Sequence, residues 1–206
     1  MNFFPKILIC FFLLANFANV SNAQISSGIL KTSEGFLAVI NSDSLWFTIQ
    51  LDDSRFKEPQ FIEASRLEVI SHVLYVQMLR ESDVSTKKEI NPLISLMNWE
   101  TDYIRNSENA IKKRSDFIID SLGTKSTISG VNTNAWYYSI NIDENDLYIY
   151  FLDIYKNGEF IRIEYYGNLE NARTSTSNLF SQLNFYSNEI DIAKLQAALS
   201  NGKFGY

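Results

Sequence analysis

Two long runs typical of β-strands flank the pair Asn157-Gly158, and no other feature limits the possible folds as strongly. Residues 147–155 (LYIYFLDIY) precede the pair, and residues 160–166 (FIRIEYY) follow it. Asn-Gly favours the two-residue turn whose twist matches that of paired antiparallel strands. Residues 135–142 (AWYYSINI) form a third run just before these two. The sequence therefore predicts a three-stranded antiparallel meander.

Two helices are expected around this meander. Asn91-Pro92 is a natural helix start, because asparagine caps a helix and proline fits its first turn. Apolar residues then recur every three or four positions, which predicts a crossover helix at about 92–111. The spacing of Leu179 and Leu183 predicts a C-terminal helix at about 174–185. We expect a single-domain α+β fold that consists mainly of antiparallel sheet.

The residues before the crossover helix also indicate strands. Residues 35–40 and 45–51 are predicted to form a hairpin, because 45–51 (LWFTIQL) alternates with a period of two. Residues 52–65 are polar and contain a proline, which predicts a loop. Residues 67–79 are rich in β-branched side chains and predict one strand that is apolar on both faces, although a buried helix would also fit.

The N-terminus is typical of an export signal. Lys6 supplies a positive charge, residues 7–15 are apolar, and Ser21 and Ala23 place small residues before a cleavage site. The apolar run is shorter than the ~20 residues that cross a bilayer. We expect an exported protein, periplasmic or secreted, with no transmembrane segment after cleavage. An uncleaved membrane anchor is the alternative.

Cleavage near Ala23-Gln24 would divide the chain into four segments. These are a signal peptide (1–23), a flexible polar lead-in (24–34), an α+β domain (35–186) and a short helical tail (187–206).

Composition argues against several classes of protein. The chain has one cysteine and one histidine, which excludes an internal disulfide framework and a site built from several histidines. Its net charge of −6 argues against nucleic acid as a partner. It contains no glycine-rich phosphate loop and no dinucleotide fingerprint. We therefore expect no cofactor, no metal site and no nucleic-acid partner.

Catalysis would have to use an unusual set of residues. His72 is the only imidazole, and inside a predicted strand it is expected to be a satisfied or edge histidine. Asp153 and Arg162 are expected to pair across the Asn157-Gly158 hairpin, which explains both without catalysis. A carboxylate-based hydrolase would need at least two acids in one pocket. The candidates are Glu100, Asp143, Asp146, Asp153 and Glu164.

Aromatic side chains are concentrated on the three strands of the meander. Packing within the sheet explains them, because aromatic residues pack well on a pleated surface. The alternative is a binding surface, in which one sheet face presents tyrosine and tryptophan to a ligand or partner. The candidate binding residues are Trp136, Tyr138, Tyr148, Tyr150 and Tyr165.

The order of these features supports a resemblance to a known fold. A glycine precedes Ala135-Trp136, two long strands joined by Asn157-Gly158 follow, and a helix with the pattern Leu179-Phe180-x-x-Leu183 closes the domain. Over residues 35–186 this order resembles the PsbP-like fold family. The front half, with residues 45–49 (LWFTI), is similar to small exported proteins of Bacteroidetes-type bacteria.

The resemblance implies an accessory or binding role and carries over no catalytic residue. We therefore expect an exported, non-catalytic binding or accessory module of the bacterial cell envelope. Its partner would be an envelope protein or a small ligand. Two alternatives are a carboxylate-based hydrolase and a carrier that holds a small hydrophobic ligand between helix and sheet.

Overall fold

The computed structural model describes residues 26–52, 54–56, 58–84, 91–106, 116–121, 131–142 and 145–200. The predicted signal peptide lies outside these residues, as does Asp143, one of the candidate acids. Within the described part of the chain, no helix is both long and apolar enough to cross a membrane.

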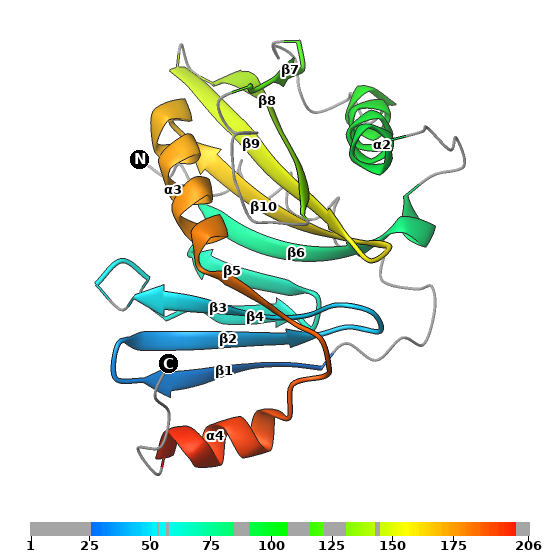
Figure 1. Ribbon diagram of the computed structural model, residues 1–206. Helices are drawn as coiled ribbons and strands as arrows, with labels where there is room; N and C mark the ends of the chain where they lie inside the picture. Colours follow the sequence, from blue (N-terminus) through cyan, green and yellow to red (C-terminus); the bar gives the residue numbers. More distant parts are fainter. Residues whose placement is uncertain are drawn as a thin grey trace.

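The fold is a single-domain α+β structure in which two antiparallel sheets share a hydrophobic core (Figure 1). The first sheet has the order β1 (Ser26–Thr32), β2 (Gly35–Asn41), β3 (Trp46–Asp52) and β11 (Leu183–Tyr186). The second has the order β4 (Gln60–Glu63), β5 (Arg66–Ile70), β6 (Leu74–Arg80), β10 (Glu159–Gly167), β9 (Asn145–Lys156), β8 (Asn132–Ile142) and β7 (Ile118–Ile119).

Helices cover both faces of the second sheet. The helix α2 (Pro92–Asn106) packs against β8 and β9 on one face, and α3 (Leu169–Ser181) packs against β9 and β10 on the other. A short 3-10 helix (Glu81–Asp83) follows β6, and α4 (Ile192–Ser200) lies against the first sheet. Figure 1 shows α2 and α3 on opposite sides of the long strands.

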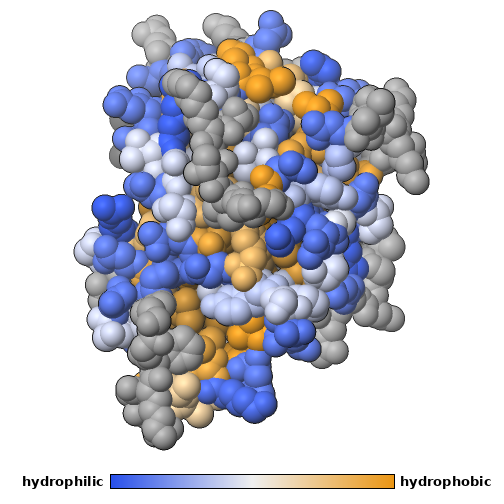
Figure 2. Space-filling view, viewed as in Figure 1, coloured by the Kyte–Doolittle hydropathy of each residue, from blue (hydrophilic) through white to orange (hydrophobic). Residues whose placement is uncertain are grey.

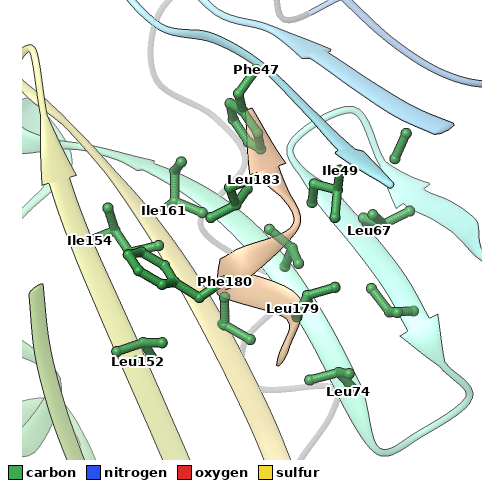
Figure 3. Packing of buried hydrophobic residues seen from close by; sticks show 14 of the residues in the cluster. Phe47, Ile49, Leu67, Leu74, Leu152, Ile154, Ile161, Leu179, Phe180 and Leu183 are labelled. Atoms are coloured by element: carbon green, nitrogen blue, oxygen red, sulfur yellow. The ribbon is translucent and has the colours of Figure 1, made fainter. Parts of the chain in front are cut away.

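The core lies between the two sheets and is closed by the end of α3. Asn168 caps this helix, since its Oδ1 accepts hydrogen bonds from the backbone N–H groups of Glu170 and Asn171 at 2.9 and 3.3 Å. The helix then directs its apolar residues into the core, where side chains from both sheets converge (Figure 3). The labelled members are Phe47, Ile49, Leu67, Leu74, Leu152, Ile154, Ile161, Leu179, Phe180 and Leu183.

The predicted meander is confirmed. Strands β8, β9 and β10 pair in sequence order, and Asn157 and Gly158 form the turn with φ of 53° and 83°. The tip of this hairpin also holds the two sheets together. Ser44 Oγ donates to the carbonyl of Asn157 at 2.9 Å, and Asn157 Nδ2 donates to the carbonyl of Ser44 at 3.2 Å. The turn is therefore fixed by tertiary contacts as well as by its own conformation.

The two predicted helices are present with different limits. The described crossover helix spans Pro92–Asn106, and residues 107–111 of the prediction lie outside the described residues. The C-terminal helix begins at Leu169, before the predicted start, because the Asn168 cap nucleates it there. Its predicted end was wrong, because Leu183 belongs to β11, which pairs with β3.

Residues 67–79 do not form the single strand that was predicted. They form β5 and β6, joined by a turn at residues 71–73 that places His72 at a φ of 59°. The N–H of Val73 donates to the carbonyl of Ile70 at 3.0 Å and closes this turn. No glycine or proline marks the reversal, so the apolar run concealed it.

Two further segments predicted as irregular are strands. Residues 26–32, within the predicted flexible lead-in, form β1 and pair with β2 along its length. Residues 60–63, within the predicted loop, form β4 and pair with β5. Both strands lie at the end of a sheet and carry polar residues, which is why hydrophobic periodicity does not reveal them.

The last described helix belongs to the domain. On α4, Ile192, Leu195 and Leu199 pack against an apolar cluster formed by β1 and β2. Asn41 secures the segment before the helix, because its side chain donates to the carbonyl of Ile190 at 2.8 Å and accepts from the N–H of Ile190 at 3.0 Å. The first sheet is therefore covered on its outer face by α4.

We predict that Phe180→Ala destabilises the protein by about 3–5 kcal/mol, because Phe180 is buried in the shared core and its removal leaves a cavity. Urea unfolding followed by circular dichroism would measure the change. Asn178→Ala, at an exposed position of the same helix, should change stability by less than about 0.5 kcal/mol. Similar losses for both variants would contradict this view of the core.

Candidate functional site

The two faces of the second sheet differ in chemistry. Along β10, Ile161 and Ile163 point into the core between the sheets, whereas Arg162 and Glu164 point to the opposite face. We call this opposite face the charged face. Its buried acidic and basic residues are Arg66, Glu68, Asp153, Arg162 and Glu164.

Arg162 is the centre of the charged face. Its Nε and Nη2 donate to the two carboxylate oxygens of Asp153 at 2.7 and 3.1 Å, and its Nη1 donates to Glu100 Oε2 on α2 at 2.8 Å. Trp136 Nε1 donates to Asp153 Oδ2 at 2.8 Å. The side chains of Arg162, Asp153 and Glu100 are only 2%, 0% and 9% exposed. The predicted pair of Asp153 and Arg162 is confirmed.

Aromatic rings enclose this ion pair. The Arg162 guanidinium lies 4.6 Å from the ring centroid of Phe151 and 5.7 Å from that of Trp136. These two rings stack with centroids 4.3 Å apart, and Phe117 packs edge-on against Trp136 and Tyr138. The charges are thus held in a medium of low polarity, where each of them must have a partner.

A second ion pair lies beside the first. Arg66 Nη2 donates to Glu164 Oε2 at 3.1 Å, and the Tyr166 hydroxyl donates to the same oxygen at 3.2 Å. The Arg66 guanidinium lies 4.7 Å from the ring centroid of Tyr75. The hydroxyl of Tyr75 donates to Glu68 Oε1 at 3.1 Å. A continuous set of polar contacts therefore crosses β10, β6 and β5.

Glu68 connects this set to the turn that holds His72. The backbone N–H of His72 donates to Glu68 Oε1 at 2.9 Å, and Gln60 Nε2 donates to Oε2 at 2.6 Å. The His72 imidazole is 62% exposed, and its Nδ1 lies 3.7 Å from Glu68 Oε1. His72 is thus an exposed turn residue, and its backbone N–H donates a hydrogen bond to the buried carboxylate of Glu68. The prediction that His72 lies within a strand was wrong.

The environment shifts the pKa values of these acids in opposite directions. Burial raises the pKa of Glu100, and the carboxylates of Glu164 and Asp153 add to this, so that Arg162 does not bring it back to the ordinary 4.5. Burial also acts to raise the pKa of Glu68. Its hydrogen bonds from His72, Gln60 and Tyr75 outweigh that effect and lower the pKa.

The five predicted binding residues lie on both faces of the sheet. Trp136 and Tyr138 are buried on the charged face near α2. Tyr150 and Tyr165 are buried on the core face. Tyr148 is half-buried. The structure therefore does not unite the five in one surface, and a binding role for them stays a prediction.

Tyr148 lies in a small, partly exposed group of side chains at one end of the sheet. Its ring lies 6.0 Å from that of Tyr137 in a T-shaped arrangement, and Tyr137 pairs across the sheet with Ile118 of β7. Ile118 is 42% exposed. We call Ile118, Tyr137 and Tyr148 the aromatic end of the sheet. Hydrophobic residues reach the surface where β7 and β8 lie (Figure 2). Ile118 and Tyr137 are not among the predicted binding residues, because their exposure depends on where the sheet ends, which strand periodicity does not reveal.

The candidate acids converge only in part. Glu100 and Asp153 both bind Arg162, and Glu164 binds Arg66. Asp146 lies at the exposed start of β9, where Asn141 donates to it at 3.0 Å. Asp143 lies outside the described residues. Among the described residues, no three His, Cys, Asp or Glu side chains form a group that could hold a metal ion.

Comparisons with known proteins find similarity in structure but none in sequence. No model of a known protein family matches the chain, and no curated protein matches it in sequence. The structure is similar to the solution structure of cyanobacterial PsbP (CyanoP) from Synechocystis sp. PCC 6803, with a TM-score of 0.39 and 11% sequence identity. The alignment covers 84% of this chain and 99% of CyanoP. The similarity to exported proteins of Bacteroidetes-type bacteria stays a prediction.

We predict that Arg162→Met destabilises the protein by about 3–5 kcal/mol at neutral pH, because it leaves Asp153 and Glu100 buried without their cation. Urea unfolding would measure the loss. Lys194→Met is the control, since Lys194 pairs with Asp191 at an exposed site and its loss should cost no more than about 1 kcal/mol. Equal losses of stability for the two variants would contradict the prediction that the buried ion pairs of Arg162 contribute more to stability than an exposed pair.

Proposed function

We propose that this protein is an exported, non-catalytic binding or accessory module of the bacterial cell envelope. The observation that carries the non-catalytic part of the proposal is that the acids of the charged face and of α2 are bound by other groups of the protein. Asp153, Glu100 and Glu164 are each held by an arginine, and Glu68 accepts hydrogen bonds from a tyrosine, a glutamine and a backbone N–H. These groups hold strands and α2 together and are not presented to a substrate.

This arrangement does not favour the two alternatives. In a glycosidase, the two catalytic carboxylates flank the glycosidic bond of the substrate. They must therefore be accessible to a substrate that enters from solvent. The side chain of Asp153 is fully buried, and Asp153 and Glu100 bind the same arginine, Arg162. A carrier would need space between α2 and the meander. Met97 and Ile104 of α2 pack there against the aromatic rings of β8 and β9.

We propose the aromatic end of the sheet as the surface that contacts the partner. Tyrosine contributes a large apolar contact area together with a polar hydroxyl, and such side chains are enriched in binding interfaces. Ile118 adds an exposed aliphatic side chain next to Tyr137. Beside this surface, Arg173 Nε of α3 donates to Oδ2 of the buried Asp120 at 2.6 Å, which connects the helix to the residue that follows β7.

We predict that Tyr148→Ala reduces recovery of the bound partner at least about fivefold, since loss of an interface anchor costs more than about 1 kcal/mol. Tagged full-length protein would be purified from envelope extracts of its own host and the bound components quantified by mass spectrometry. Tyr186→Ala is the control, because Tyr186 is 47% exposed but lies on the first sheet. Unchanged recovery with Tyr148→Ala would exclude this surface, and a wild-type protein that purifies alone would contradict partner binding.

We predict that the exported protein begins at Gln24. Ala23→Arg should block cleavage, because signal peptidase requires a small residue at this position, and a larger precursor should accumulate. Mass spectrometry of the intact protein from cell fractions would show both species. Wild-type protein that retains residues 1–23 would contradict the proposed processing.

A further inference from the structure

The arginine beneath α2 is shared unequally by two carboxylates. Asp153 accepts three hydrogen bonds, two from Arg162 and one from the Trp136 indole. Glu100 accepts one, from Arg162 Nη1. Two carboxylates that share one cation in a buried site cannot both be ionised without cost. One of the two is therefore the weaker anion, and the hydrogen bonds identify it as Glu100.

The surroundings increase this imbalance. The other carboxylates of the charged face accept more hydrogen bonds than Glu100. Glu164 accepts one from Arg66 and one from Tyr166, and Glu68 accepts three. Arg66 and Arg162 therefore face the four carboxylates of Glu68, Glu100, Asp153 and Glu164, which gives the buried cluster an excess of negative charge. Binding one proton would reduce that excess.

Glu100 differs from the other three in its position. It belongs to α2, whereas Glu68, Asp153 and Glu164 belong to the strands of the sheet. The charged groups that face it are Asp153 of β9 and Arg162 and Glu164 of β10. On α2 itself, Asp102 and Arg105 pair with each other at an exposed site. If α2 moved off the sheet, Glu100 would leave the cluster while Asp153 and Arg162 stayed paired.

We propose that α2 docks on the second sheet together with a proton, and that Glu100 carries this proton. The direct consequence is a helix whose attachment depends on pH. Docked Glu100 holds its proton more tightly than Glu100 in water, because burial and the neighbouring carboxylates raise its pKa. The docked state is therefore favoured at low pH. Docking weakens as the pH rises above 4.5 and continues to weaken up to the pKa of the docked form.

Hydrogen exchange of the backbone amides of α2 tests the proposal in the intact chain. Exchange would be followed by mass spectrometry from about pH 5 to about pH 8 and corrected for the intrinsic pH dependence of exchange. Protection of α2 in the wild type should fall by up to about tenfold per pH unit within the titration range of Glu100. Amides of β3, in the other sheet, should not follow this change.

Two variants separate the proton from the rest of the contact. Glu100→Gln keeps an acceptor for Arg162 and removes the charge, so α2 should be at least as protected as in the wild type and should lose its pH response. Asp102→Asn removes an exposed carboxylate from the same helix and should behave as the wild type. The proposal is overturned if Glu100→Gln exposes α2 at every pH, or if its pH response equals that of the wild type.

A second measurement does not depend on the stability of any variant. Carbon-13 NMR of the Glu100 carboxyl in the wild type would follow its titration directly. A midpoint above 4.5 supports the proposal, and a midpoint at or below 4.5 overturns it. An equal pH response in the amides of β3 would also overturn it, because the change would then reflect unfolding of the whole domain and not the docking of α2.

Discussion

The rest of this structure depends on the ion pairs that the buried guanidinium of Arg162 forms. It lies among Asp153 on the neighbouring strand, Glu100 on α2, and the rings of Trp136 and Phe151. A charge in such a place must be paired, because leaving it without a partner costs several kcal/mol, a large part of the stability of a typical domain. Its partners therefore determine how β8, β9, β10 and α2 are arranged.

Because these paired charges all lie on one side of the second sheet, its two faces differ in chemistry. The face towards the first sheet is apolar and closes a common core with Leu179 and Phe180 of α3. The other face carries ion pairs and aromatic rings beneath α2. Hydrophobic contacts tolerate small changes in position, whereas hydrogen-bonded ion pairs require a fixed geometry. The charged face consequently sets the position of α2 more strictly than apolar packing alone would.

Local patterns predicted the parts of the molecule that depend on neighbouring residues. Asn157-Gly158 specifies its turn through positive φ values, and the register that follows places Asp153 opposite Arg162. The patterns failed where the structure depends on distant partners. The turn at His72 carries no glycine, and its backbone is held by Glu68. Strands β1 and β4 exist because β2 and β5 supply their hydrogen bonds.

The sequence by itself determined the meander, the crossover helix at Pro92 and the ion pair across the hairpin, because each follows from residues close together along the chain or in strict register. Only the tertiary structure decided that Glu100 joins that pair, that four of the five candidate aromatic residues are buried, and that Tyr137 and Tyr148 are half-buried. Burial is a property of what packs over a residue, and strand periodicity alone does not say which face of a sheet is covered or where its cover ends.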